Sequence, residues 1–167
     1  MLKFSCSSFV LMAAVALGTF APVAANAQPG GALIGKWSAG RVSSIQYRDS
    51  YTGVHAPTNG NHFAYEFRPD GTYSFTGLMQ SVMYNCATAV FSQETGTYTT
   101  DGSTVSLRPE KNPYKMTYSC SPSSNREAPG KLINKTYRMR ITQDGNNERL
   151  ELSDGSGASP QVFTRSR

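Results

Sequence analysis

The chain has 167 residues, of which 38% are hydrophobic and 11% aromatic, and its formal net charge at pH 7 is +5. It contains nine tyrosines, fifteen glycines and a single tryptophan. This length and composition fit one domain. They exclude a membrane protein, a multidomain enzyme, and a helical bundle rich in Ala, Leu, Glu and Lys.

The first 27 residues have the features of a secretory signal peptide. Lys3 supplies a positive charge, residues 9–17 (FVLMAAVAL) form an apolar core, and residues 25–27 (Ala-Asn-Ala) form a small-x-small cleavage site. The core is about half as long as a membrane span, which needs about 20 apolar residues. We therefore expect an exported protein, periplasmic or secreted, with a mature domain at 28–167 and no membrane span.

Alternating apolar and polar residues dominate the rest of the chain. In 62–68, for example, Phe63, Tyr65 and Phe67 occupy one face and polar residues occupy the other. This period of two predicts half-buried antiparallel strands, and Asp-Gly pairs between several segments favour tight hairpin turns. Strands are predicted at 35–47, 62–68, 72–79, 82–92, 94–99, 103–108, 114–120, 135–143, 148–153 and 160–165.

These segments predict an all-β domain with an antiparallel up-and-down meander of about eight strands, because some neighbours fit one bent strand. Closing the meander into a barrel hides its edges, whereas a two-sheet sandwich is the alternative. The best helical candidate, 81–93, fits a strand equally well. Two polar loops, 49–61 and 121–131, are long enough to be functional or mobile, and we expect any protein partner to bind through them.

Two cysteines remain once Cys6 leaves with the signal peptide. In an exported protein, Cys86 and Cys120 most simply form one disulfide, worth about 3–4 kcal/mol for a loop of this length. Two free buried thiols are the alternative. No metal site is expected, because two cysteines and two histidines without close spacing do not form one.

Residues 33–37 (LIGKW) resemble the Gly-x-Trp signature on the first strand of lipocalins and the wider calycin superfamily. Residues 67–73 and 96–102 resemble hairpins of bacterial exported lipocalin-like domains. Residues 163–165 (Phe-Thr-Arg) place an arginine on the last predicted strand. The resemblance implies a lipocalin-like β-barrel over 28–167, in which Arg165 packs across Trp37 to close one end.

A barrel of eight strands is either filled by side chains or holds one small ligand. An aromatic and methionine lining with phenol hydroxyls suits a mostly apolar small molecule. The predicted ligand-binding residues are Tyr65, Phe67, Tyr73, Phe75, Tyr98, Tyr118, Tyr137 and Met139. The alternative is that these side chains only fill the core.

Enzyme signatures are missing from the sequence, so we expect no catalytic residues and no cofactor. His55 and His62 could act as acid–base groups, but both fit a solvated surface better. Glu66 and Glu94 are a weaker carboxylate pair. Lys131, Lys135, Arg138 and Arg140 form a modest basic cluster that fits a solvated outer face and not nucleic-acid binding.

The leading hypothesis is therefore a lipocalin-like binding protein for a small, mostly apolar molecule, without catalysis. An interaction protein on the same barrel, such as a proteinase inhibitor, is the alternative.

Overall fold

The structure is a computed structural model that describes residues 31–42, 47–48, 55–56 and 59–166. The predicted signal peptide, the side chain of His55 and most of the predicted 49–61 loop lie outside the residues so described. The strands are β1 (Gly35–Val42), β2 (Tyr47–Arg48), β3 (His55–Ala56), β4 (Gly60–Phe67), β5 (Thr72–Met83), β6 (Cys86–Asp101), β7 (Thr104–Lys111), β8 (Pro113–Tyr118), β9 (Arg126–Pro129), β10 (Lys135–Asp144), β11 (Asn147–Ser153) and β12 (Gln161–Arg165). Two 3-10 turns, η1 (Gly31–Leu33) and η2 (Pro122–Ser124), are the only helical elements of the described part.

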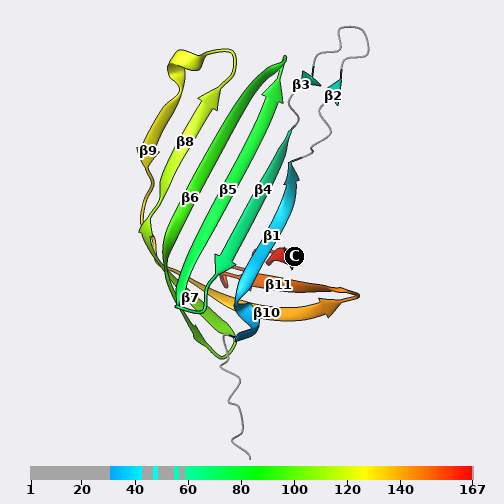
Figure 1. Ribbon diagram of the computed structural model, residues 1–167, viewed down its shortest axis with the longest axis vertical. Coiled ribbons are helices and arrows are strands. Elements are labelled where there is room, and N and C mark those ends of the chain that lie inside the picture. Colours follow the sequence, from blue (N-terminus) through cyan, green and yellow to red (C-terminus); the bar gives the residue numbers. More distant parts are fainter. Residues whose placement is uncertain (1–30, 43–46, 49–54, 57–58, 167) are drawn as a thin grey trace, which may run out of the picture.

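Eight strands close into a hydrogen-bonded ring (Figure 1). The ring runs β1, β4, β5, β6, β7, β10, β11 and β12, and β12 returns to pair with β1 through Trp37 opposite Arg165. Every pairing in it is antiparallel. The prediction of an all-β antiparallel meander that closes with about eight strands is therefore confirmed. The short strands β2 and β3 pair separately from it.

The wall divides along β6. Residues 95–101 of β6 pair with β7, whereas residues 88–92 pair with β8, which in turn pairs with β9. The register shifts between Thr95 and Gly96, where a β-carbon on Gly96 would collide with the backbone of Arg108 and Pro109. We call the closed part the base. The part of β4, β5 and β6 that rises beyond it, with β8 and β9, is the upper sheet (Figure 1).

Three sequence expectations need correction. The β5–β6 turn at Tyr84 and Asn85 falls inside the predicted strand 82–92, because the chain turns there without glycine. The predicted strands 82–92 and 94–99 are largely one strand, β6, because β5 pairs along most of its length. The predicted loop 121–131 contains η2 and β9, because its residues pair with β8.

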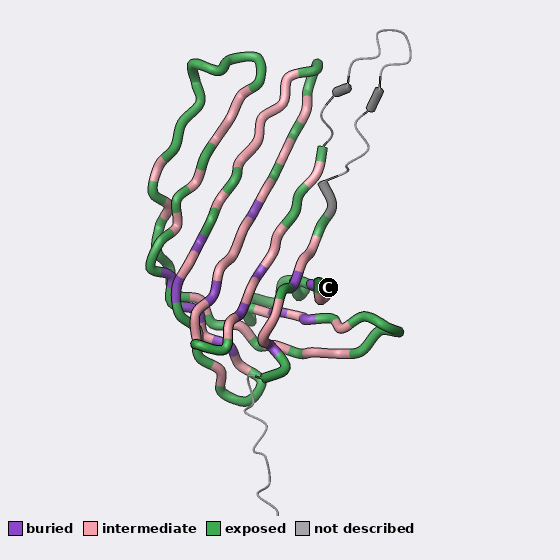
Figure 2. The backbone as a smooth tube through the Cα atoms, in the orientation of Figure 1, coloured by how far each residue is buried: buried purple, intermediate pink, exposed green. Residues whose placement is uncertain are grey.

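The hydrophobic core fills the base, and Figure 2 shows most of the buried segments in the lower half of the molecule. Its aromatic rings contact one another directly: Tyr65 lies 5.4 Å from Phe67 and 5.3 Å from Phe163 between ring centroids. The buried apolar members are Leu33, Trp37, Tyr65, Phe67, Tyr73, Val105, Leu107, Leu150, Leu152 and Phe163.

Trp37 and Arg165 form the floor of this core. The Arg165 guanidinium carbon lies 4.2 Å from the Trp37 ring centroid, and the indole donates to the Leu33 carbonyl at 2.7 Å. Arg165 also donates to the carbonyls of Ile34 (2.7 Å) and Ala32 (2.6 Å). Gly35 has φ +129°, and a β-carbon there would collide with Arg165. The glycine of the Gly-x-Trp motif thus makes room for the arginine that covers the tryptophan.

Candidate ligand-binding site

Glu94 is a buried carboxylate on the inner side of β6, with 2% of its surface exposed. It accepts a hydrogen bond from the Tyr73 hydroxyl at 2.8 Å, and both of its oxygens accept from Lys135 Nζ, at 3.0 and 2.9 Å. Burying a carboxylate is costly unless it is paired and hydrogen-bonded. Glu94 meets this condition through partners on two other strands, β5 and β10.

The Glu94 cluster lies where the packed base ends. Glu94 pairs in register with Phe75, and Phe75 pairs with Tyr65 of the core. Lys135 Nζ lies 5.9 Å from the Phe75 ring centroid, and 30% of its side chain is exposed. The cluster therefore presents a partly exposed lysine side chain at the boundary between the core and the inner face of the upper sheet.

The phenols around Glu94 are held in their protonated form. Burial, followed by the nearby Tyr137 and Glu94, raises the pKa of Tyr65 well above its usual value. Burial, followed by the hydrogen bond to Glu94, does the same to the pKa of Tyr73. Both hydroxyls are thus hydrogen-bond donors at neutral pH, which does not suit a general base or a nucleophile.

Beyond Glu94, the inner face of the upper sheet carries apolar residues interspersed with small polar ones, Ser81, Thr88 and Ser92, and Arg126 donates to Met116 Sδ at its β8–β9 edge. Phe63 stacks on Phe75 at 6.2 Å, and Gly77 lies opposite Phe63 in the register. Further out, Val90 pairs with both Met79 and Met116, which places all three on the same face. Met79 is 51% exposed and Val90 and Met116 are half-buried. Within the described residues, this face therefore offers accessible apolar surface next to the Lys135 ammonium.

Seven of the eight predicted binding residues come together, and Tyr118 does not. Tyr65, Phe67 and Tyr73 are buried in the core, where their rings leave no surface for a ligand. Tyr118 lies on β8 opposite Thr88, two residues from Met116 and on the same inner face of the upper sheet. The remaining four, Phe75, Tyr98, Tyr137 and Met139, are partly buried and pack against the core.

The sequence predicts Glu94 only as a weak carboxylate pair with Glu66, and Lys135 only as part of a solvated basic cluster, whereas the structure pairs the two on the inner side of the wall. Glu94 lies four residues before Tyr98, and Lys135 lies two residues before Tyr137. Because residues an even number of positions apart on a strand share a face, the alternation places both on the inner face. A grouping by charge alone does not separate Lys135 from Arg138 and Arg140, although Lys135 faces the other side of the strand. Those two arginines lie exposed on the outer side, whereas Lys135 reaches inward to Glu94.

The groups considered for catalysis are not assembled. His62 is exposed. Glu66 bonds Arg68 at 2.8 Å on the outer side of the wall, so it lies on the opposite face from Glu94 and the two carboxylates form no pair. In the described part of the chain, no group of three or more His, Cys, Asp or Glu side chains could hold a metal ion.

Among the residues with a described structure, no helix is long and apolar enough to cross a membrane. Compared with known proteins, the chain matches no family model, no curated protein and no solved structure.

Proposed function

We propose that this chain is an exported, lipocalin-like binding protein for a small, mostly apolar molecule, and that it carries no catalytic chemistry. The observation that carries the proposal is the position of Lys135. Its partly exposed side chain lies at the edge of a filled core, beside accessible apolar residues. The proposed site is therefore the inner face of the upper sheet, above the packed base.

The apolar part of the ligand would cover Phe63, Met79, Val90 and Met116. Removing apolar surface from water is worth about 25 cal/mol per Å², and flexible methionines adapt to ligands of different shape. This chemistry supports binding of an aliphatic or aromatic body without fixing its identity.

The polar end of the ligand would face Lys135. An ammonium group has three N–H donors, and the two contacts from Nζ to protein oxygens both go to Glu94. A further donor can bind a ligand oxygen, such as a carbonyl, hydroxyl or carboxylate. The pairing with Glu94 holds Lys135 in place, so the anchor is preorganised.

Native mass spectrometry of the protein purified from its own host tests the proposal, and a co-purifying small molecule is expected. Binding of the fluorescent probe 1-anilinonaphthalene-8-sulfonate locates the site. Met79→Ser should weaken probe binding at least fivefold. Phe91→Ser is the matched control, because Phe91 is similarly exposed (43%) but lies on the outer face of β6. Equal losses in both variants would contradict an inner-face site.

An interaction protein, such as a proteinase inhibitor, is the second candidate. Residues 121–127 are all exposed, and the adjacent Cys120 is tied to β6 by a disulfide, as a preorganised binding loop would be. Co-purification of a protease with the exported protein would favour this function. The co-purification should then be lost on cleavage or substitution of the 121–131 segment, and Met79→Ser should leave it unaffected.

A further inference from the structure

The β5–β6 turn lies at the outer end of the upper sheet (Figure 1). It exposes two large hydrophobic side chains. Met83 is 68% exposed and Tyr84 is 93% exposed. No other large hydrophobic residue in the described part of the chain has so large an exposed fraction as these two. Adjacent apolar side chains at the end of a hairpin form a projecting contact surface, unlike single apolar residues scattered over a surface.

The backbone conformation of this turn is one that tyrosine rarely adopts. Tyr84 and Asn85 have φ values of +49° and +63°, which a two-residue type I′ turn requires and which bulky residues rarely adopt. The turns at Gly71, Gly102 and Gly145 place glycine at positive φ instead. A local rule broken at one position is typical of a functional site, because another requirement fixes the residue there.

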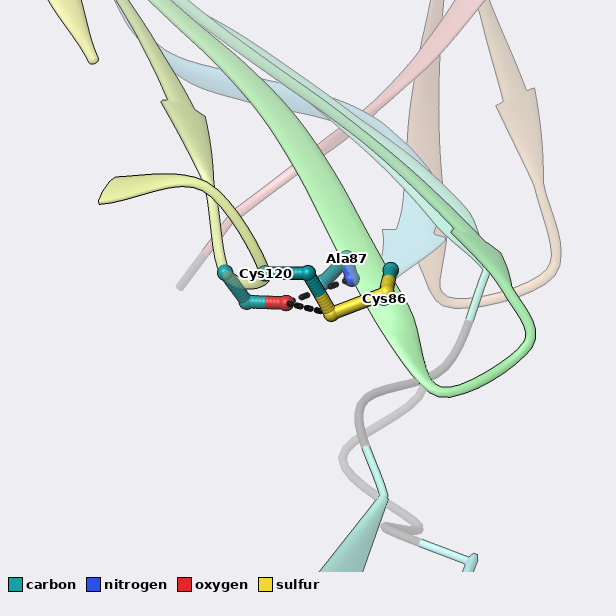
Figure 3. Close-up of a disulfide and its surroundings, with 4 residues drawn as sticks. Cys86, Ala87 and Cys120 are labelled. Atoms are coloured by element: carbon teal, nitrogen blue, oxygen red, sulfur yellow. Dashed lines mark hydrogen bonds between the residues drawn. A yellow bond between two sulfur atoms is a disulfide. The ribbon is translucent and has the colours of Figure 1, made fainter. Parts of the chain in front are cut away.

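Covalent and hydrogen bonds hold the turn in place. Cys86, directly after the turn, forms the predicted disulfide with Cys120, with the two Cα atoms 5.4 Å apart (Figure 3). The Ala87 N–H donates to Ser119 Oγ at 2.7 Å, and the Ser119 N–H donates to the Ala87 carbonyl at 2.9 Å. These bonds restrain the strand that directly follows the tip, which lowers the entropy lost on binding.

The chemistry of the tip selects the kind of partner. Residues 81–88 and 119–125 contain no charged side chain. A membrane surface would require basic residues for lipid headgroups or a larger apolar area to insert. A second copy meeting tip to tip would bury far less than the roughly 800 Å² per partner of a stable interface. A projecting, uncharged tip with one phenol fits an apolar recess in a different protein.

We propose that Tyr84, presented by the β5–β6 turn, is an anchor residue that inserts into an apolar recess of a second, different protein. Rigid tyrosines are frequent among residues that dominate binding energy, because they bring a large contact area and a hydroxyl at low entropic cost. The proposal does not depend on the ligand site, which lies below the tip on the inner face.

Photo-cross-linking in the native host tests the proposal. The photoreactive residue p-benzoylphenylalanine is placed at position 84 and, as the control, at position 91 on the outer face of β6. We expect one dominant heterologous protein adduct from position 84 only. Excess wild-type protein should compete for this adduct, and Tyr84→Asn protein should need at least a tenfold higher concentration.

Tyr84→Asn separates anchoring from folding, because asparagine accepts positive φ more readily than tyrosine. Its melting temperature should equal or exceed that of the wild type, and Tyr84→Phe should compete almost as well as the wild type. Equal adducts from both positions or equal competition by Tyr84→Asn would overturn the proposal. So would Tyr84-dependent sedimentation with phosphatidylglycerol vesicles, or an adduct with a second copy of the chain.

Discussion

The base and the upper sheet share β4, β5 and β6 but differ in how the inner faces of these strands are used. Along β5, the inner residues change from Tyr73 and Phe75 in the base to Gly77, Met79 and Met83 above it. The aromatic rings of the base pack against side chains from the opposite wall. The upper residues have no opposite wall, because the upper part of β6 pairs with β8 and not with β7, so the ring does not close there. Stability therefore concentrates in the base, and the inner face of the upper sheet stays accessible.

Trp37→Ala tests the base most directly and should have the largest effect. It removes a fully buried indole together with the surface on which Arg165 stacks. We expect a loss of about 3–5 kcal/mol in the free energy of unfolding, measured by urea denaturation with circular dichroism. Probe affinity, measured where both proteins are folded, should be unchanged. Normal stability with lost binding would contradict the division between the two regions.

Removing the disulfide tests the upper sheet. The variant Cys86→Ser/Cys120→Ser should lose about 3–4 kcal/mol in the free energy of unfolding, from the loop-closure entropy that the disulfide removes. The loss should be local, with faster hydrogen exchange in β8 and the upper part of β6. Trp37 fluorescence, which reports on the base, should keep its native spectrum below the unfolding transition. Equal loss of protection in β11 and β12 would show that the two regions unfold as one unit.

Lys135→Met tests the boundary between the regions. It leaves the buried Glu94 with only the Tyr73 hydroxyl among its two partners. We expect a loss of about 2 kcal/mol, less than for a fully buried pair because Lys135 is partly exposed. Adding Glu94→Gln should recover part of it.

Arg140→Met is the matched control for Lys135→Met. Arg140 lies on the same strand as Lys135, β10, and pairs with Glu151 of β11 at 3.0 Å, but 70% of its side chain is exposed. Its loss should cost less than about 0.5 kcal/mol. Equal costs for the two variants would show that Lys135 behaves as an ordinary surface residue.

The sequence predicts the base better than the upper sheet, for physical reasons. The strand alternation and the Gly-x-Trp segment are local signals, so the closed meander and the positions of Trp37 and Arg165 follow from short stretches of sequence. The sequence does not predict the turn at Tyr84 and Asn85, because Asn85 is not followed by glycine and a bulky tyrosine precedes it. Strand alternation places Met79 on the inner face. Its exposure depends on where the opposite wall of the ring ends, and no local sequence pattern predicts that position.

The buried tyrosines of the base provide the most delicate test. Tyr65 and Tyr73 have folded-state pKa values raised above the usual value of 10.0, chiefly by burial. The unfolded chain therefore releases their protons first, and the stability that they contribute is present below pH 10 and falls as the pH rises beyond it. At pH 10 half of the unfolded phenols are ionised, so each of the two residues should cost about 0.4 kcal/mol.

Urea denaturation between pH 8 and 10.5 measures this loss. Tyr65→Phe should reduce the slope of stability against pH, because phenylalanine has no proton to release. Tyr84→Phe is the control, because Tyr84 is almost fully exposed. If the slope is unchanged by Tyr65→Phe but reduced by Tyr84→Phe, the alkaline loss arises at the tip of the upper sheet, and the base is not the region whose burial controls stability.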